Sequence, residues 1–245
     1  MNIPPRTKRE YLSQLVEDKG RWFRPPSDAE KAKGFLGWHE RGYLPHCDYP
    51  GLVQFVTFRL ADSLPESRRG EWEHLLAIED VRERRTKLEA YLDRGVGACW
   101  LRDPRVAGLA EAALLHFHRQ RYELLAWCVM PNHVHVLVEV WQTPLGKLIQ
   151  SWKRFVATRA LKLIRAERRT PIRLGHELEA AESFWEREYW DTFMRDEKQE
   201  QTAVRYIENN AMKAKLCRFA EEWAFGSARF RGVDGVLTIG RSAEL

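Results

Sequence analysis

The stretch MPNHVHVLVE, residues 130–139, decides the fold because it joins turn residues to a valine-rich run that carries two histidines. Short β-branched runs form strands, and alternate side chains of a strand point to opposite faces of the sheet. His133, His135, Leu137 and Glu139 are therefore expected on one face. The valines at 134, 136, 138 and 140 form the other face, which reads as core. Two imidazoles side by side on a strand can bind a metal ion.

The segments on either side of this strand alternate between strand and helix patterns. Strands are predicted at 54–60 and 122–129, and helices at 65–92 (two), 106–119, 144–169 and 196–209, with 184–194 either a strand or irregular. Asp103-Pro104 is a helix start signal, and Asp196 with Gln199 fits a capping box. The order predicts an α+β fold with a ferredoxin-like antiparallel sheet and helices packed mainly on one face.

Three regions are expected along the chain. Residues 1–45 form an N-terminal arm, which we expect to be extended with a turn at 43–46. Residues 46–216 form the central domain, and residues 217–245 a C-terminal extension. No apolar stretch approaches the roughly 20 residues of a membrane helix, and no secretory signal is visible, so a cytoplasmic protein with no membrane partner is expected. The four cysteines form no CxxC, which argues against a zinc ribbon or a disulfide framework.

Positive charge is concentrated in the long predicted helix. Between residues 145 and 176 nine lysines and arginines face a single acid, Glu167, so few ion pairs within the helix can neutralise them. Such a patch is typical of a surface that binds a phosphate backbone. The alternative is a helix face that is merely solvated, which the scarcity of acidic partners disfavours. The predicted DNA-binding residues are Lys147, Lys153, Arg154, Arg159, Lys162, Arg165 and Arg169.

A second candidate for chemistry lies on the helix predicted at 196–209. Tyr206 and Asn210 are four residues apart and so share one helix face. If that face docks beside His133 and His135, two imidazoles and an amide oxygen suit Mg²⁺ or Mn²⁺ better than zinc. Tyr206 could then act as a nucleophile, but a free tyrosine has a pKa near 10 and needs activation. No general base can be identified from the sequence.

These segments together resemble the HUH single-tyrosine transposases, and more closely the REP-associated tyrosine transposases, from about residue 41 to 230. The resemblance rests on RGYLPHCDYPGLVQFVTFRLADSLP (41–65), LLAWCVMPNHVHVLVEV (124–140), LIQSWKRFVA (148–157), FWEREYWDTFMRDE (184–197) and YIENNAMKAKL (206–216). By this resemblance His133 and His135 are metal ligands, Asn210 is a third ligand and Tyr206 is the nucleophile.

The resemblance also implies a reaction and partners. The family cuts single-stranded DNA at hairpin-associated sites, leaves a 5′-phosphotyrosine on the enzyme and rejoins strands by the reverse step. A monomer or a homodimer that acts on single-stranded or hairpin DNA in a bacterial, nucleoid-associated setting is expected. Ala211 departs from the family's usual proline, which weakens the expectation for Asn210. Tyr189 is a rival nucleophile, and Asp191 and Glu139 are rival carboxylates.

Two other functions fit the same residues. The sheet and its basic surface could bind hairpin DNA or structured RNA without chemistry. A zinc hydrolase of small phosphoesters is the third reading, although such a substrate needs no basic patch. A second HxH, His116 and His118, lies in a helical segment where positions two apart do not share a face, so no site is expected there.

Overall fold

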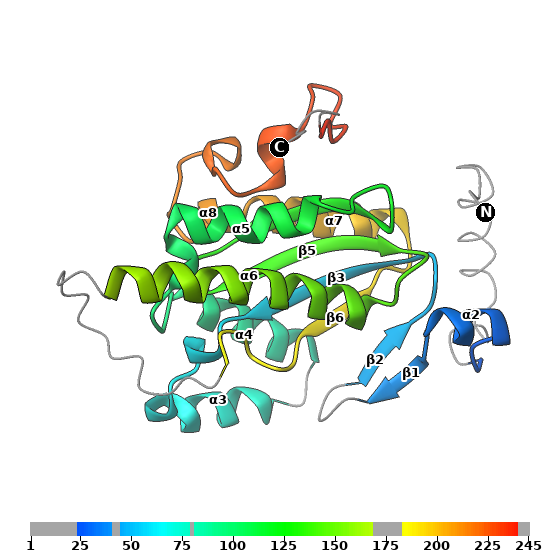
Figure 1. The fold of residues 1–245 in the computed structure, drawn as a ribbon, viewed down its shortest axis with the longest axis horizontal. Coiled ribbons are helices and arrows are strands. Elements are labelled where there is room, and N and C mark those ends of the chain that lie inside the picture. The colour runs from blue at the N-terminus through cyan, green and yellow to red at the C-terminus, as the bar shows by residue number, and fades with distance from the viewer. Residues whose placement is uncertain (1–23, 41–44, 79–80, 169–182, 240–245) are drawn as a thin grey trace.

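A four-stranded antiparallel sheet lies at the centre of the computed structural model, which describes residues 24–40, 45–78, 81–168 and 183–239 (Figure 1). Its strands are β3 (Leu52–Arg59), β4 (Tyr122–Val129), β5 (His133–Val140) and β6 (Trp190–Phe193), in the order β4-β5-β3-β6. The helices are α2 (Asp28–Lys33), α3 (Arg69–Leu76), α4 (Val81–Asp93), α5 (Pro104–Leu115), α6 (Leu145–Arg168), α7 (Glu197–Glu208) and α8 (Asn210–Lys213). Helical segments connect β3 to β4, the strands β4 and β5 are consecutive, and α6 connects β5 to β6. This order of elements is the ferredoxin-like arrangement.

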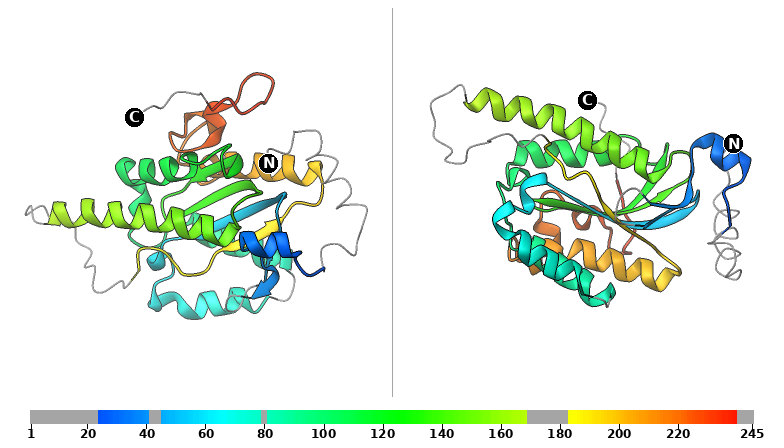
Figure 2. Two further views of the ribbon diagram at one scale, coloured as in Figure 1. Left: turned by 45° about the vertical axis from the view of Figure 1, so that its right-hand side comes forward. Right: turned by 90° about the horizontal axis from the view of Figure 1, so that it is seen from below.

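Both faces of the sheet are buried because helices cover both of them (Figure 2). On one face the valines of β5 pack with α5 and α6 in the larger core cluster. On the other face Phe55 and Leu137 pack against Ile207 of α7 and Ala211 of α8. Trp72 of α3 and Tyr91 of α4 pack with Trp190 of β6 in a further cluster. The α+β class is confirmed, but the expectation of helices mainly on one face holds only for α5 and α6, since α3, α4 and α7 form a second layer.

Local signals fixed most of the elements. Asp103 accepts a hydrogen bond from the Arg105 backbone N–H and caps α5, with Pro104 at its first position. Asp196 caps α7 through the Gln199 N–H at 2.8 Å. The strands predicted at 54–60 and 122–129 are confirmed as β3 and β4, and the segment 184–194 contains the short strand β6.

The N-terminal region differs from the predicted extended arm. It contains α2, capped by Ser27 in a capping box, and a hairpin of β1 (Gly37–Glu40) with β2 (Pro45–Asp48). The predicted turn at 43–46 is therefore partly wrong, since Pro45 and His46 lie in β2, while residues 41–44 lie outside the described residues. The loop predicted at 170–180 also lies outside them. Within the described residues, no helix has the length and apolar character needed to cross a membrane.

Both edges of the sheet carry added structure. At the β4 edge, the Val129 N–H donates to the Phe225 carbonyl at 2.9 Å, and Arg231 binds Glu208 at the end of α7. Part of the predicted C-terminal extension therefore covers this edge, which protects unpaired strand groups. At the opposite edge, the β1–β2 hairpin meets β6.

A buried polar cluster fastens that hairpin to β6. The Nδ1 atom of the fully buried His46 lies 2.7 Å from Asp191 Oδ1, and its Nε2 atom lies 3.6 Å from Glu188 Oε2. Gln54 Nε2 donates to Asp191 Oδ2 and to the Cys47 carbonyl. Burial disfavours a charged imidazole, but the hydrogen bond and the negative charge of Asp191 outweigh it, so the pKa of His46 is raised above 6.5.

The cluster predicts a pH-dependent contribution to stability. Because the folded protein binds the His46 proton more tightly than the unfolded chain, this stabilisation is complete below pH 6.5 and is lost as the pH rises through the raised pKa. His46→Gln should lower the free energy of unfolding by about 1–3 kcal/mol in mild acid, and by less in alkaline buffer. Urea denaturation of both proteins across this range measures the difference, and a difference independent of pH would contradict the assignment.

Candidate active site

The two histidines of β5 meet inside the protein on the face covered by α4 and α7. Both side chains are fully buried, and their Nε2 atoms lie 3.0 Å apart. The register of the sheet places His135 opposite Thr57 and His133 opposite Arg59 of β3. The strand alternation expected from the sequence therefore holds, and it directs both imidazoles to a single point.

Hydrogen bonds from neighbouring residues orient His133. Asn132 Nδ2 donates to the Val96 carbonyl at 3.0 Å, which turns Asn132 Oδ1 toward His133 Nδ1 at 2.7 Å. An amide oxygen can only accept, so His133 Nδ1 carries the proton and His133 Nε2 keeps its lone pair. Asn132, expected only as a turn residue, thus sets the tautomer that a metal ligand requires.

His135 is held in a similar way. Its Nδ1 atom lies 2.8 Å from Thr57 Oγ1, and its ring stacks on Phe55 with centroids 5.5 Å apart. Burial also lowers the pKa of His133 from 6.5 to about 3, so its imidazole is neutral at physiological pH. Both imidazoles are therefore oriented, and that of His133 is neutral, which is the form in which imidazole binds metals.

Tyr206 of α7 lies beside this pair. Its ring packs edge-on against His135, with centroids 5.8 Å apart, and its hydroxyl donates to Glu89 Oε2 at 2.7 Å. Burial, followed by the charge of Glu89, raises the pKa of Tyr206 well above its usual value of 10. The phenol is therefore protonated at rest. Lys213 Nζ lies 4.3 Å from the centroid of the same ring.

Asn210 joins the site from the first turn of α8. Its side chain is fully buried beside the Tyr206 hydroxyl, and hydrogen bonding from its amide lowers the pKa of Tyr206. Neither amide atom makes a hydrogen bond of strict geometry among the described residues. A buried amide with incomplete hydrogen bonding could bind a ligand. Ala211, which stands where the resembling family usually has proline, is fully buried, and its backbone hydrogen-bonds the Cys128 thiol.

Two acids of α4 complete the surroundings, and the sequence analysis identified neither of them. Asp93 Oδ1 lies 3.9 Å from His133 Nε2, and burial, with the charge of Glu89, raises the pKa of Asp93 to about 6. Glu89 lies one helical turn earlier on the same helix. Nothing local in the helix pattern distinguishes these acids from solvent-exposed ones such as Glu83.

The rival residues lie elsewhere. Tyr189 packs against His46 in the larger core cluster, and Asp191 pairs with His46. Glu139 shares the face of the histidines but stands four residues from His135, about 13 Å along a strand. His118 Nδ1 accepts the Leu124 N–H in the turn after α5. The structure brings none of these four to the histidine pair.

The described residues contain no group of three His, Cys, Asp or Glu side chains in a metal-binding arrangement. The pair of Nε2 atoms could bind a divalent cation, and the buried amide oxygen of Asn210 beside Tyr206 could add an oxygen ligand. Such a nitrogen and oxygen mixture would fit Mg²⁺ or Mn²⁺ completed by phosphate and water oxygens. Asp93 Oδ1, buried and without a hydrogen-bond donor among the described residues, adds a further oxygen beside His133.

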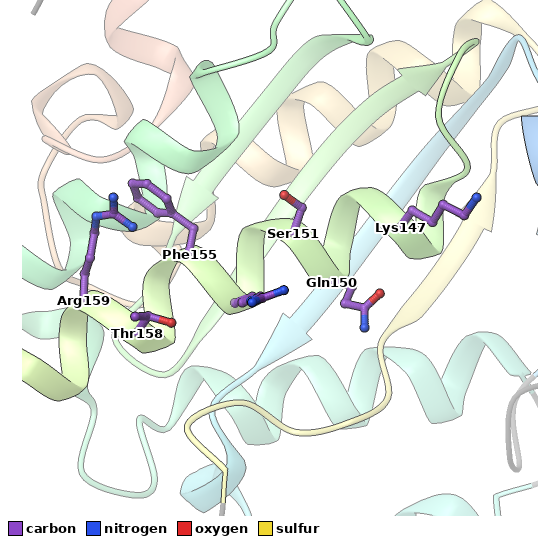
Figure 3. A pocket seen from close by; sticks show the side chains of 7 residues that line it. Lys147, Gln150, Ser151, Phe155, Thr158 and Arg159 are labelled. Carbon is purple, nitrogen blue, oxygen red and sulfur yellow. The ribbon is translucent and has the colours of Figure 1, made fainter.

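The predicted DNA-binding helix lies on the other side of the sheet. A hollow of about 560 Å³ runs along the outer side of α6 and is lined by Lys147, Gln150, Ser151, Arg154, Phe155, Thr158 and Arg159 (Figure 3). The Arg159 guanidinium lies over the Phe155 ring at 3.7 Å, and Lys162 and Arg165 are exposed farther along α6. The sheet separates this surface from Tyr206.

Two of the predicted DNA-binding residues, Lys153 and Arg169, are not among the described exposed residues of this surface. Lys153 Nζ donates to the backbone carbonyls of residues 186, 187 and 188, so it holds the segment before β6. Arg169 lies outside the described residues.

Comparison with known proteins agrees with this arrangement. Residues 108–210 match the family model described as "Transposase IS200 like", which spans less than half of the chain but includes the histidine pair, Tyr206 and Asn210. This match agrees with the resemblance to tyrosine transposases that the sequence predicts. Thr57, Glu89 and Asp93 lie outside the matched segment.

One solved structure is also similar: "Structure of the REP associates tyrosine transposase bound to a REP hairpin". It is 16% identical, with a TM-score of 0.44, over 78% of this chain and 83% of the other. This similarity is too weak to support an inference about the site. No curated protein sequence matches the chain.

The hydrogen bonds around His133 make a prediction that needs no bound ligand. In the wild type, His133 should carry its proton on Nδ1, and Asn132→Leu should shift the imidazole toward the Nε2-protonated form because the accepting amide oxygen is lost. Long-range ¹H–¹⁵N spectra of ¹⁵N-histidine protein report the tautomer directly. A matched substitution, Thr57→Val, should alter His135 and leave His133 unchanged; an unaltered His133 signal in Asn132→Leu would refute the orientation assigned to Asn132.

Proposed function

We propose that this protein is a divalent-metal-dependent nuclease and strand transferase that cuts single-stranded DNA at hairpin-associated sites, with Tyr206 as the nucleophile. The observation that carries the proposal is the contact of Tyr206 with His135, beside a second imidazole and the buried amide of Asn210. The family match over residues 108–210 supports the same reaction class.

His133, His135 and Asn210 would hold Mg²⁺ or Mn²⁺, with Asp93 close enough to His133 to contribute an oxygen or to orient a bound water. A bound divalent cation supplies charge stabilisation to the phosphate under attack. Burial keeps the His133 imidazole neutral, because it lowers the pKa of His133 to about 3. The Tyr206 hydroxyl then forms a bond to phosphorus while the bond to the 3′ oxygen breaks, which leaves a 5′-phosphotyrosine and a free 3′-OH.

The reverse reaction at the same site would account for strand joining. A 3′-OH that replaces the departed strand attacks the phosphotyrosine, and the phenol regains its proton. No nucleotide cofactor is required, because the phosphotyrosine bond conserves the energy of the phosphodiester.

The basic surface of α6 would bind the DNA backbone at a distance from the cleavage site. Its cations are exposed, and α6 covers the opposite face of the sheet from α7, which carries Tyr206 (Figure 2). DNA that touches both must therefore pass an edge of the sheet. A hairpin with a single-stranded flank has the shape that this separation requires, since the duplex and the flank can reach different faces. The protein would act on this DNA as a monomer or as a homodimer.

The nucleophile is tested by covalent capture. Wild-type protein with hairpin oligonucleotides and Mg²⁺ or Mn²⁺ should give a denaturant-resistant protein–DNA band that chelator removes. Tyr206→Phe should abolish the band while hairpin binding survives, and Tyr189→Phe should retain it because Tyr189 lies against His46. Adduct formation by Tyr206→Phe would refute the assignment; tight binding without any adduct from the wild type would favour the non-catalytic binding module.

The α6 surface is tested by the salt dependence of binding. Arg154→Gln and Arg159→Gln should each weaken hairpin binding and reduce the slope of log affinity against log salt by about 0.7–0.9, the value for one lost phosphate contact. Arg105→Gln, an exposed arginine of α5 paired with Asp103, is the matched control. Slopes equal to wild type in both α6 variants would show that this helix faces solvent in the complex.

A further inference from the structure

We infer that Glu89 is the general base that takes the Tyr206 proton during cleavage and returns it during strand joining. This inference rests on the proposed function and names the group that the sequence could not supply. Its basis is geometric: Tyr206 Oη donates directly to Glu89 Oε2 at 2.7 Å, within the range needed for proton transfer.

The other polar groups around the phenol cannot serve in this way. Asn210 has no site that accepts a proton near neutral pH, and Lys213 is a cation beside the ring. His135 contacts Tyr206 through its ring, while its nitrogen atoms face Thr57 and His133. Glu89 is the only carboxylate recorded in contact with the Tyr206 hydroxyl among the described residues.

Glu89 could assist Tyr206 either by accepting its proton or by stabilising the phenolate, and the negative charge of Glu89 excludes the second role. A carboxylate next to a phenol disfavours the phenolate, and burial acts in the same direction, so the Tyr206 pKa is raised. Glu89 therefore cannot help by stabilising an ionised tyrosine at rest. It can help by accepting the proton as the oxygen attacks, which avoids a free phenolate altogether.

The step balances in atoms and charge. The Tyr206 oxygen forms a bond to phosphorus, its proton passes to the Glu89 carboxylate, and the bond between phosphorus and the 3′ oxygen breaks. The departing 3′ oxygen takes a proton from water. In strand joining the attacking 3′-OH loses its proton to water, and the neutral Glu89 carboxyl returns its proton to the phenol oxygen.

The position of Glu89 in the fold supports a dedicated role. It projects from α4, and this helix is fixed by Leu88, Tyr91 and Leu92, which pack with Trp72 of α3. The helix thus presents Glu89 to Tyr206 of α7 from 117 residues away in sequence. A rigid element is the support that a proton acceptor needs if its distance to the nucleophile is to stay constant.

The test is Glu89→Gln, which keeps the shape and a hydrogen-bond acceptor but removes the basic carboxylate. With hairpin DNA and Mn²⁺, adduct formation should slow by about 100- to 10,000-fold, the usual contribution of a general base, while hairpin affinity stays at the wild-type value. The variant's rate should also rise with pH over the range where the wild-type rate is level. Glu83→Gln, the same substitution at an exposed position of α4, should behave as wild type.

Two further measurements separate proton transfer from a structural role. Removal of the anion should lower the pKa of Tyr206, which ¹³Cζ-tyrosine spectra follow; a purely electrostatic role would then speed the reaction, whereas loss of the base slows it. An oligonucleotide with a bridging 3′ sulfur has a leaving group that needs no proton. The Glu89→Gln defect should persist on this substrate, and its disappearance would assign Glu89 to the leaving group instead.

The outcomes separate the two proposals. Full-rate adduct formation by Glu89→Gln, beside an active wild type and an inactive Tyr206→Phe, overturns the role of Glu89 and leaves the nuclease intact. Absence of adduct from the wild type overturns the nuclease, and the role of Glu89 falls with it. A Glu89→Gln protein that no longer binds hairpin DNA shows that Glu89 supports the fold or the DNA surface, which also contradicts the inference.

Discussion

The pairing of β3 with β5 is the constraint on which the rest of the structure depends. It is antiparallel over eight residues of each strand, and it sets Thr57 opposite His135. A slip of one residue would send the imidazoles to the α6 face and the valines to the Tyr206 face. Because both faces are buried, such a slip would place imidazoles in the apolar core and leave the site empty, so the register is strongly specified.

The two layers of helices divide the chemistry from the positive charge. Neutral imidazoles, an amide and a protonated phenol tolerate burial between the sheet and the layer of α4 and α7. The cations of α6 stay at the surface because burying a charge without a partner is costly. Lys153 is half-buried, and the cost of burying its charge is offset by hydrogen bonds that its ammonium donates to three backbone carbonyls before β6.

Much of the fold could be predicted because its signals are local. The alternation in β5, the caps at Asp103 and Asp196, and the turn before His133 each act within a few residues. Helices on a second face could not be predicted, since periodicity identifies a buried stripe but not the layer that buries it. The hairpin at β1 and β2 was missed for a related reason: its strands are short, and His46 is held by Asp191, 145 residues away.

The sequence by itself determined the strand that carries His133 and His135, the four-residue spacing of Tyr206 and Asn210, and the run of charge along α6. These depend on spacing, which a linear sequence records. Only the tertiary structure decided that Tyr206 packs on His135 while Tyr189 packs on His46, and that Glu89 receives the Tyr206 hydroxyl. Such contacts join residues far apart in the chain, and their formation depends on how whole helices dock on the sheet. No local pattern in α4 marks the acid that faces the site.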